Sequence, residues 1–189
     1  NERTKPSLFS QPVEEAFFMP PLLCVTVTAA TTAELRRRRD ETTADMVELR
    51  LDTVADLDVA GALAGRRSPV VVTCRPAWEG GRFTGSEEER RRILDRALDA
   101  GAEYVDVEVG ARFTDLVRRG GRRIVLSMHD FDGTPVDLSQ RVAWMRSERP
   151  GVVKVAVTAR RLSDCLPLLD LASAAGAGRA FQNSVATRQ

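Results

Sequence analysis

The chain alternates short, β-rich apolar runs with helical stretches, and this rhythm restricts the folds open to it. The strand candidates are residues 22–28, 45–51, 70–75, 103–109, 122–128 and 152–158. Stretches rich in Arg, Glu, Leu and Ala separate or follow them, at residues 31–42, 58–65, 86–100, 113–120, 137–148 and 161–176. Strands that alternate with helices form βα units, which build a parallel sheet. We therefore predict an α/β domain.

Two parallel-sheet folds fit this pattern. A doubly wound sheet usually carries a glycine-rich phosphate-binding turn after its first strand. The first strand here runs into VTVTAATT, which contains no glycine. A (β/α)₈ barrel instead places reactive residues at the carboxyl ends of many strands. The pattern alone leaves both folds open, and the positions of charged residues distinguish them.

Composition and charge exclude several classes of function. The formal net charge of +1 lacks the positive excess that a nucleic-acid-binding face needs. No apolar run approaches the roughly 20 residues of a membrane helix, and residues 1–20 lack the features of a signal peptide. The scattered Cys24, Cys74 and Cys165 suggest neither a disulfide framework nor a zinc site. We predict a cytoplasmic protein without metal, nucleic-acid or membrane partners, with a tail over residues 1–20 and one domain over residues 21–189.

Charged residues lie in strands that a parallel sheet would bury on both faces. Glu48 and Arg50 are two positions apart and share a face, as do Asp106 and Glu108. Three other strands also carry ionisable groups: Arg75 ends one, His129 follows another and Lys154 lies within a third. Buried charges cost stability unless they pair, so charges that converge on one mouth of a barrel indicate a site. A structural ion pair between Glu48 and Arg50, and a structural role for Asp106 and Glu108, remain alternatives.

Lys154 is unusual because only Lys5 and Lys154 are lysines among 28 basic residues. We interpret the arginine runs 36–39 and 90–92 as solvated helix faces. Apolar neighbours disfavour exposure of Lys154, and burial would lower the pKa of its amine. A neutral amine can attack a carbonyl to form a Schiff base, whereas a guanidinium stays protonated. His129, one strand earlier, would be its neighbour and could move protons on a bound substrate.

Five motifs occur in the order found in a known family. They are ELRLD (48–52), TCRPAWEGG (73–81), YVDVE (104–108), SMHDFDGTP (127–135) and VKVAVTAR (153–160). With them, the stretch from Pro21 to Ala175 resembles type I 3-dehydroquinate dehydratase. The resemblance implies a (β/α)₈ barrel of the TIM type and a cofactor-free hydro-lyase of the shikimate pathway, which leads to chorismate and aromatic amino acids. Such an enzyme eliminates water from 3-dehydroquinate to give 3-dehydroshikimate through a lysine Schiff base.

The resemblance also implies a role for each matched residue. Lys154 would form the imine with the C3 ketone, His129 would act as general acid and base, and Glu79 would orient His129. The matched substrate contacts are Thr26, Glu48, Arg50 and Arg75. Asp106 would support the site from behind.

The C-terminal part departs from the family pattern. The family continues into a glycine-rich segment whose arginine grips the substrate carboxylate, and into a lid loop with a serine and a glutamine. Here residues 179–181 could begin a seventh strand, and no eighth is evident, so we expect a barrel that is truncated or incomplete after strand six or seven. A partner subunit would then cover the open edge, which predicts a homodimer. Two alternatives remain: another Schiff-base lyase of the aldolase type, and a catalytically impaired barrel that serves as a binding or assembly module.

Overall fold

Six parallel strands form one sheet in chain order. The computed structural model describes residues 22–174, so the predicted tail over residues 1–20 and the predicted strand at 179–181 lie outside the described part. The strands are β1 (Cys24–Thr28), β2 (Met46–Arg50), β3 (Val70–Thr73), β4 (Tyr104–Glu108), β5 (Ile124–Asp130) and β6 (Val152–Val157). Each strand pairs with the next in parallel. The six predicted strands are confirmed.

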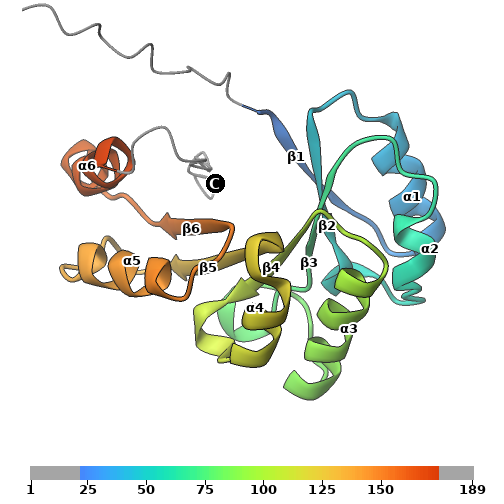
Figure 1. Cartoon of the computed structure of the whole chain (residues 1–189). Helices are drawn as coiled ribbons and strands as arrows, with labels where there is room; N and C mark the ends of the chain where they lie inside the picture. Colours follow the sequence, from blue (N-terminus) through green and yellow to red (C-terminus); the bar gives the residue numbers. More distant parts are fainter. Residues whose placement is uncertain (1–21, 175–189) are drawn as a thin grey trace, which may run out of the picture.

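A helix follows every strand. The helices are α1 (Thr32–Glu41), α2 (Val59–Leu63), α3 (Glu87–Asp99), α4 (Thr114–Gly120), α5 (Leu138–Ser147) and α6 (Leu166–Ala174). The sheet curls, with α1 to α5 on its outer side (Figure 1). A doubly wound sheet reverses its strand order at a switch point, whereas a barrel winds in one direction. The unbroken order β1 to β6 therefore confirms a barrel-type α/β fold, here an open part of a barrel.

The start of α3 shows how local sequence sets an element. The Ser86 hydroxyl accepts the Glu89 backbone N–H at 3.2 Å, and the Glu89 carboxylate accepts the Ser86 backbone N–H at 2.8 Å. This capping box satisfies N–H groups that the first helical turn leaves without partners. Beyond the helix, Gly101 adopts a φ of 81°, which a residue with a Cβ rarely adopts. The predicted helix 86–100 is confirmed to within a residue at each end.

Alternate residues of each strand face different cores. Val47, Leu49, Val105 and Val107 pack with the helices on the outer side. Inside the barrel, a second apolar cluster gathers one residue from each of four strands: Met46, Val71, Val125 and Val152. We call these four residues the lower layer. Because side chains alternate along a strand, the residues two positions later face the same interior.

Two arginines of the predicted solvated runs are buried, so that prediction is wrong for Arg39 and Arg90. The guanidinium of Arg39 donates to the backbone carbonyls of Ala62 and Ala64 at the end of α2, at 2.5 and 3.0 Å. These carbonyls have no partner within their own helix, and a basic side chain there stabilises the helix terminus. None of the helices within residues 22–174 has the length and apolar character needed to cross a lipid bilayer.

Candidate active site

A polar layer lies directly above the lower layer inside the barrel. It consists of one residue from each strand or strand end, two positions after the residue beneath it: Thr26, Glu48, Thr73, Asp106, Ser127 and Lys154. Thr26 is in register with Glu48, and Ser127 is in register with Lys154. Glu48 and Asp106 are instead in register with Val71 and Val125 of the lower layer. The six side chains thus lie at staggered levels, and hydrogen bonds such as those from Thr73 to Glu48 and from Ser127 to Asp106 join them.

Lys154 is only 8% exposed and lies between two carboxylates. Its Nζ is 3.2 Å from Asp106 Oδ2 and 3.4 Å from Glu48 Oε1. Burial opposes the charged form, but Asp106 and Glu48 outweigh it and raise the pKa of the Lys154 amine. The prediction of a buried lysine is confirmed. The prediction that burial lowers its pKa is wrong, because sequence alone did not reveal two carboxylates in contact with the amine.

Hydroxyl groups hold both carboxylates in place. Thr26 and Thr73 donate to the two oxygens of Glu48 at 2.8 and 2.7 Å. Ser127 donates to Asp106 Oδ1 at 2.5 Å, and Asp106 has no exposed surface. Burial raises the pKa of Asp106, but the cations Arg75 and Lys154 and the Ser127 hydroxyl hold it below its usual range. Sequence reasoning missed Thr73 and Ser127, although their position two residues after an inward-facing valine was a usable signal.

Arg50 pairs with Asp52 rather than with Glu48. Two parallel hydrogen bonds of 2.8 Å join its guanidinium to the Asp52 carboxylate. The alternative of a structural Glu48–Arg50 pair is therefore wrong, and Glu48 is left to contact Lys154. Asp52 was part of a recognised motif but had been assigned no role.

Asp52 and a glycine fold the segment after β3 back onto the strand. The Asp52 carboxylate accepts the backbone N–H groups of Arg75 and Arg82 at 3.1 and 3.0 Å. A Cβ at Gly81 would lie 2.0 Å from the Arg75 carbonyl oxygen, so only glycine allows this approach. The resulting turn includes the short 3-10 helix η2 (Ala77–Glu79), and it carries Glu79 to the end of β5.

Glu79 and His129 form a hydrogen-bonded pair. Glu79 Oε1 lies 2.8 Å from His129 Nδ1 and also accepts the His129 backbone N–H at 2.8 Å. A carboxylate only accepts, so Nδ1 carries the hydrogen and Nε2 is the nitrogen able to take a proton. The Phe131 ring lies at 17° to the imidazole with centroids 6.4 Å apart. The predicted pairing of Glu79 with His129 is present in the structure.

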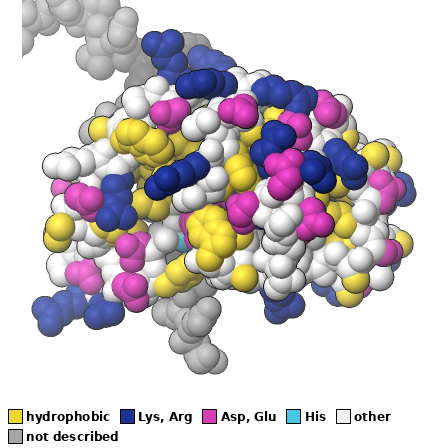
Figure 2. Space-filling model, turned by 90° about the horizontal axis from the view of Figure 1, so that it is seen from below, with side chains coloured by type: hydrophobic (Ala, Val, Ile, Leu, Met, Phe, Trp, Pro, Cys, Tyr) yellow, Lys and Arg dark blue, Asp and Glu magenta, His cyan; other side chains and the backbone are white. Residues whose placement is uncertain are grey.

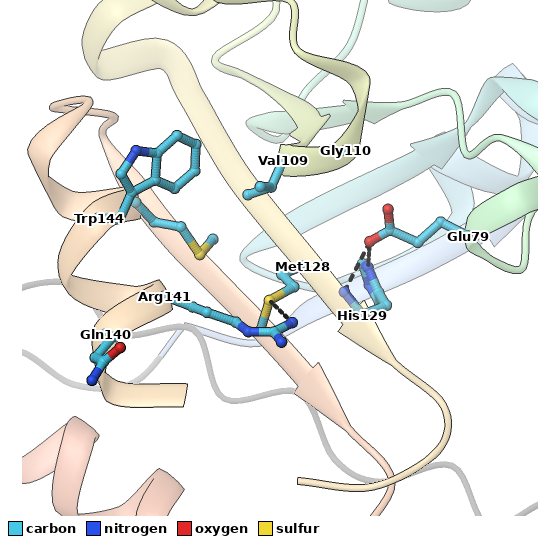
Figure 3. Close-up of a pocket in the computed structure, with 9 residues that line it drawn as sticks. Glu79, Val109, Gly110, Met128, His129, Gln140, Arg141 and Trp144 are labelled. Atoms are coloured by element: carbon cyan, nitrogen blue, oxygen red, sulfur yellow. Dashed lines mark hydrogen bonds and ion pairs between the residues drawn. The ribbon is translucent and has the colours of Figure 1, made fainter. Parts of the chain in front are cut away.

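A cavity of about 490 Å³ adjoins this pair (Figure 3). His129 and Glu79 line one side of it, and Gln140, Arg141 and Trp144 of α5 line another. Lys154 does not line it.

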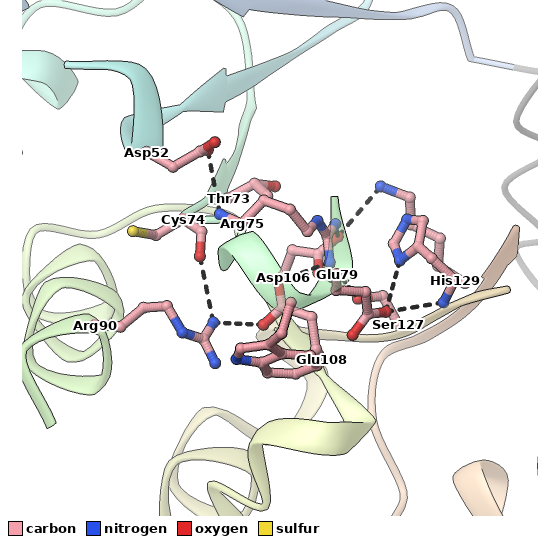
Figure 4. Close-up of polar contacts among 12 residues, drawn as sticks. Asp52, Thr73, Cys74, Arg75, Glu79, Arg90, Asp106, Glu108, Ser127 and His129 are labelled. Carbon is pink, nitrogen blue, oxygen red and sulfur yellow. Dashed lines mark hydrogen bonds and ion pairs between the residues drawn. The ribbon is translucent and has the colours of Figure 1, made fainter. Parts of the chain in front are cut away.

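Arg75 is buried, and carboxylates and a hydroxyl of neighbouring strands surround its guanidinium. Its guanidinium is 3.1 Å from Asp106 Oδ2, 2.7 Å from Glu108 Oε1 and 3.1 Å from Ser127 Oγ (Figure 4). Glu108, which the sequence left without a role, also contacts the buried Arg90. Within residues 22–174, no group of three or more His, Cys, Asp or Glu side chains is arranged to hold a metal ion.

Among the predicted site residues, Asp106, Lys154 and His129 lie close to one another, whereas Arg50 lies apart from them. Asp106 and Lys154 are in direct contact, and Asp106 is in turn within electrostatic range of His129. Arg50 is held by Asp52 at the end of β2 and has no described contact with Lys154 or His129. Asp106 contacts the Lys154 amine directly, whereas the resemblance implied only that it supports the site from behind.

Comparison with known proteins adds four findings. The type I 3-dehydroquinase family matches residues 23–187. The chain is 32% identical to the chloroplastic bifunctional 3-dehydroquinate dehydratase/shikimate dehydrogenase of Arabidopsis thaliana, over 82% of this chain and 28% of that protein. It is 35% identical to the 3-dehydroquinate dehydratase of Syntrophobacter fumaroxidans, over 79% of this chain and 69% of that protein. The crystal structure of 3-dehydroquinate dehydratase from Geobacillus kaustophilus superposes with a TM-score of 0.72 and 27% identity, over 82% of this chain and 69% of that one.

Proposed function

The chain belongs to the type I 3-dehydroquinase family, and from this premise we propose that it dehydrates 3-dehydroquinate to 3-dehydroshikimate as a Schiff-base hydro-lyase. One observation carries the proposal above all: the Lys154 amine lies inside the barrel between Asp106 and Glu48. The family assignment favours 3-dehydroquinate as the substrate, and the buried amine between two carboxylates supports Lys154 as the proposed nucleophile.

In the proposed first step, the Lys154 ammonium gives a proton to Asp106, 3.2 Å away, and the neutral amine adds to the C3 ketone. The proton then returns from Asp106 to the C3 oxygen, which leaves as water as the C=N bond forms. The iminium that results is again a cation between Asp106 and Glu48. The carboxylates that raise the pKa of the amine therefore also stabilise the charged intermediate, in a site where no solvent has to reorganise.

In the proposed second step, His129 Nε2 removes the C2 proton and the electron pair moves into the iminium to give an enamine. The enamine then expels the C1 hydroxyl, which takes the proton from His129 and leaves as water. Hydrolysis of the imine releases 3-dehydroshikimate and restores Lys154. Glu79 holds the imidazole in the required tautomer. Thr26, Glu48, Arg50 and Arg75 remain the proposed substrate contacts.

Borohydride trapping tests this proposal directly. The chain contains only Lys5 and Lys154 as lysines, so a trapped adduct can be assigned without ambiguity. We expect 3-dehydroquinate with borohydride to add one covalent adduct to the wild type and to Lys5→Arg, and none to Lys154→Arg. Absorbance of the product enone should rise in the same two proteins. A folded wild type that forms neither adduct nor enone would contradict the proposal and favour a binding or assembly module. An adduct with an aldol substrate alone would favour a lyase of the aldolase type.

We also propose a homodimer in the cytoplasm, built from one domain over residues 21–189. The far edge of β6 pairs with no strand within residues 22–174, and a second chain could cover it. The three free cysteines suit a reducing compartment. Basic and acidic side chains are interspersed on the face shown in Figure 2, which favours a small-molecule partner over nucleic acid. Light scattering of the purified chain tests the dimer.

A further inference from the structure

A series of buried, alternating charges connects helix α3 to Lys154. In order, its members are Arg90, Glu108, Arg75, Asp106 and Lys154. The successive contacts measure 2.5, 2.7, 3.1 and 3.2 Å. Four of these residues come from strands or strand ends, as the barrel fold requires. Arg90 comes from the helix layer, and the proposed chemistry has no use for it.

Arg90 has no exposed surface, and several groups fix its guanidinium. It donates to Glu108 Oε2 and, at 3.2 Å, to the Cys74 backbone carbonyl. The rings of Phe113 and Trp78 lie 4.8 and 5.8 Å from its central carbon. Burying a guanidinium costs several kcal/mol unless its hydrogen bonds are satisfied. So many fixed contacts give Arg90 one orientation, with a positive charge at one oxygen of Glu108.

The two oxygens of Glu108 are divided between two arginines. Arg90 holds Oε2 and Arg75 holds Oε1. Arg75 then reaches Asp106 Oδ2, the same oxygen that contacts the Lys154 amine. A shift of Glu108 would therefore change how Arg75 and Lys154 share Asp106.

From this geometry we infer that Arg90 is a positioning residue of the proposed dehydratase site, acting through Glu108 and Arg75 on the Asp106–Lys154 pair (Figure 4). The inference rests on the proposed function. It assigns to the helix layer a part in preparing the amine for imine formation, without any contact between Arg90 and the substrate.

The inference has a consequence for pH dependence. The charged groups facing Glu108 are Asp106 on its own strand, Arg75 at the end of β3 and Arg90 on α3. Burial and the Asp106 carboxylate raise the pKa of Glu108 to about 7, while both arginines act to lower it. Without Arg90 the pKa of Glu108 rises further. Glu108 then stays protonated at neutral pH and loses its charge-assisted bond to Arg75.

The test compares Arg90→Met, Arg90→Lys and Arg92→Met in the full chain. Arg92 is a matched control on the same helix, since its side chain is 62% exposed and pairs only with Glu88. The rate of borohydride-trapped imine formation is measured between about pH 5 and about pH 9. We expect the acid limb of Arg90→Met to move up by about one pH unit, which lowers the rate roughly fivefold at pH 7 and roughly tenfold at pH values well below the pKa of Glu108. Arg90→Lys, which keeps the charge, should recover most of that loss, and Arg92→Met should match the wild type.

A second variant keeps the test decisive if Arg90→Met does not fold. Glu108→Gln is isosteric and removes the ionisable group, so the acid limb that Glu108 causes should disappear. A wild type that forms the imine, with Arg90→Met or Glu108→Gln showing an unshifted limb, would overturn the inference and leave the proposed function intact. A wild type that forms no imine would instead overturn the proposed function itself.

Discussion

On four strands, a residue of the lower layer is followed two positions later by a residue of the polar layer, yet the two layers have opposite chemistry. Met46, Val71, Val125 and Val152 make the lower layer apolar. Directly above, Glu48, Asp106 and Lys154 place three charges at the level of the next inward-facing residues. The backbone geometry is the same in both layers. The difference teaches that the barrel interior tolerates charge only where each group has partners to satisfy it.

The two layers contribute differently to stability. Each apolar side chain of the lower layer stabilises the fold by about 1.5–3 kcal/mol through burial. The charges of the polar layer gain little net stability, because removing them from water costs about as much as their pairing returns. Mutations in the lower layer should therefore lower stability and leave the chemistry unchanged, whereas mutations in the polar layer should change activity, and should also lower stability where they leave a buried charge without its partner. The following predictions test this comparison.

The largest expected effect is on catalysis, in Lys154→Arg. Arginine keeps a cation beside Asp106 and Glu48 but cannot form an imine. We expect kcat/KM for 3-dehydroquinate to fall by a factor of roughly 10⁴ or more, since the nucleophile is lost. The thermal unfolding midpoint should stay close to that of the wild type. Substantial residual turnover in Lys154→Arg would show that the amine is not the nucleophile.

The next effect is on stability, in Asp106→Asn. This change leaves Arg75 and Lys154 without their shared carboxylate, and loss of one partner of a buried pair costs about 3–5 kcal/mol. The folded-state pKa of Asp106 lies below its ordinary value of 3.8, so its contribution is complete above about that pH and is lost as pH falls through the lower, folded-state pKa. Denaturant unfolding should show the full difference in unfolding free energy between Asp106→Asn and the wild type at neutral pH. This difference should become smaller below about pH 4. A difference that does not depend on pH would mean that Asp106 is not ionised in the folded protein.

In the lower layer, Met46→Ala should cost about 2–4 kcal/mol of unfolding free energy, because it leaves a cavity among Val71, Val125 and Val152. The rate per folded molecule should change by less than about twofold, since no charge of the polar layer is altered. Urea titration and an active-site count by borohydride trapping measure the two quantities separately. A large loss of turnover at full folding would show that the layers do not act independently.

The smallest effect concerns the surface. Arg92→Ala removes an exposed ion pair with Glu88 at 3.1 Å, which should change the unfolding free energy by at most about 0.5 kcal/mol. Added salt should have little effect on the difference between this variant and the wild type. A clearly larger loss would mean that outer ion pairs support the barrel as strongly as interior ones.

Much of this arrangement could be predicted from the sequence. The alternation of strands and helices predicted the sheet, and the period of two placed Glu48 and Asp106 on inward-facing positions. Motif order predicted the family that the profile of residues 23–187 then identified. The predictions that were wrong, such as a lowered pKa for Lys154 and an exposed Arg90, had one cause. Contacts between distant segments leave no local pattern in the sequence. The sequence predicts Arg90 to be one of several exposed helix arginines, although it is fully buried against Glu108 of β4.

The sequence by itself determined which residues of a strand share a face, because side-chain alternation is a local property of each strand. It also determined that an amine, and not a guanidinium, stands at position 154. Only the tertiary structure decided the charge state of that amine, since its pKa depends on two carboxylates located 48 and 106 residues away in the chain. Electrostatic energies depend on distances through space and on burial, and both are fixed only when the strands lie in register.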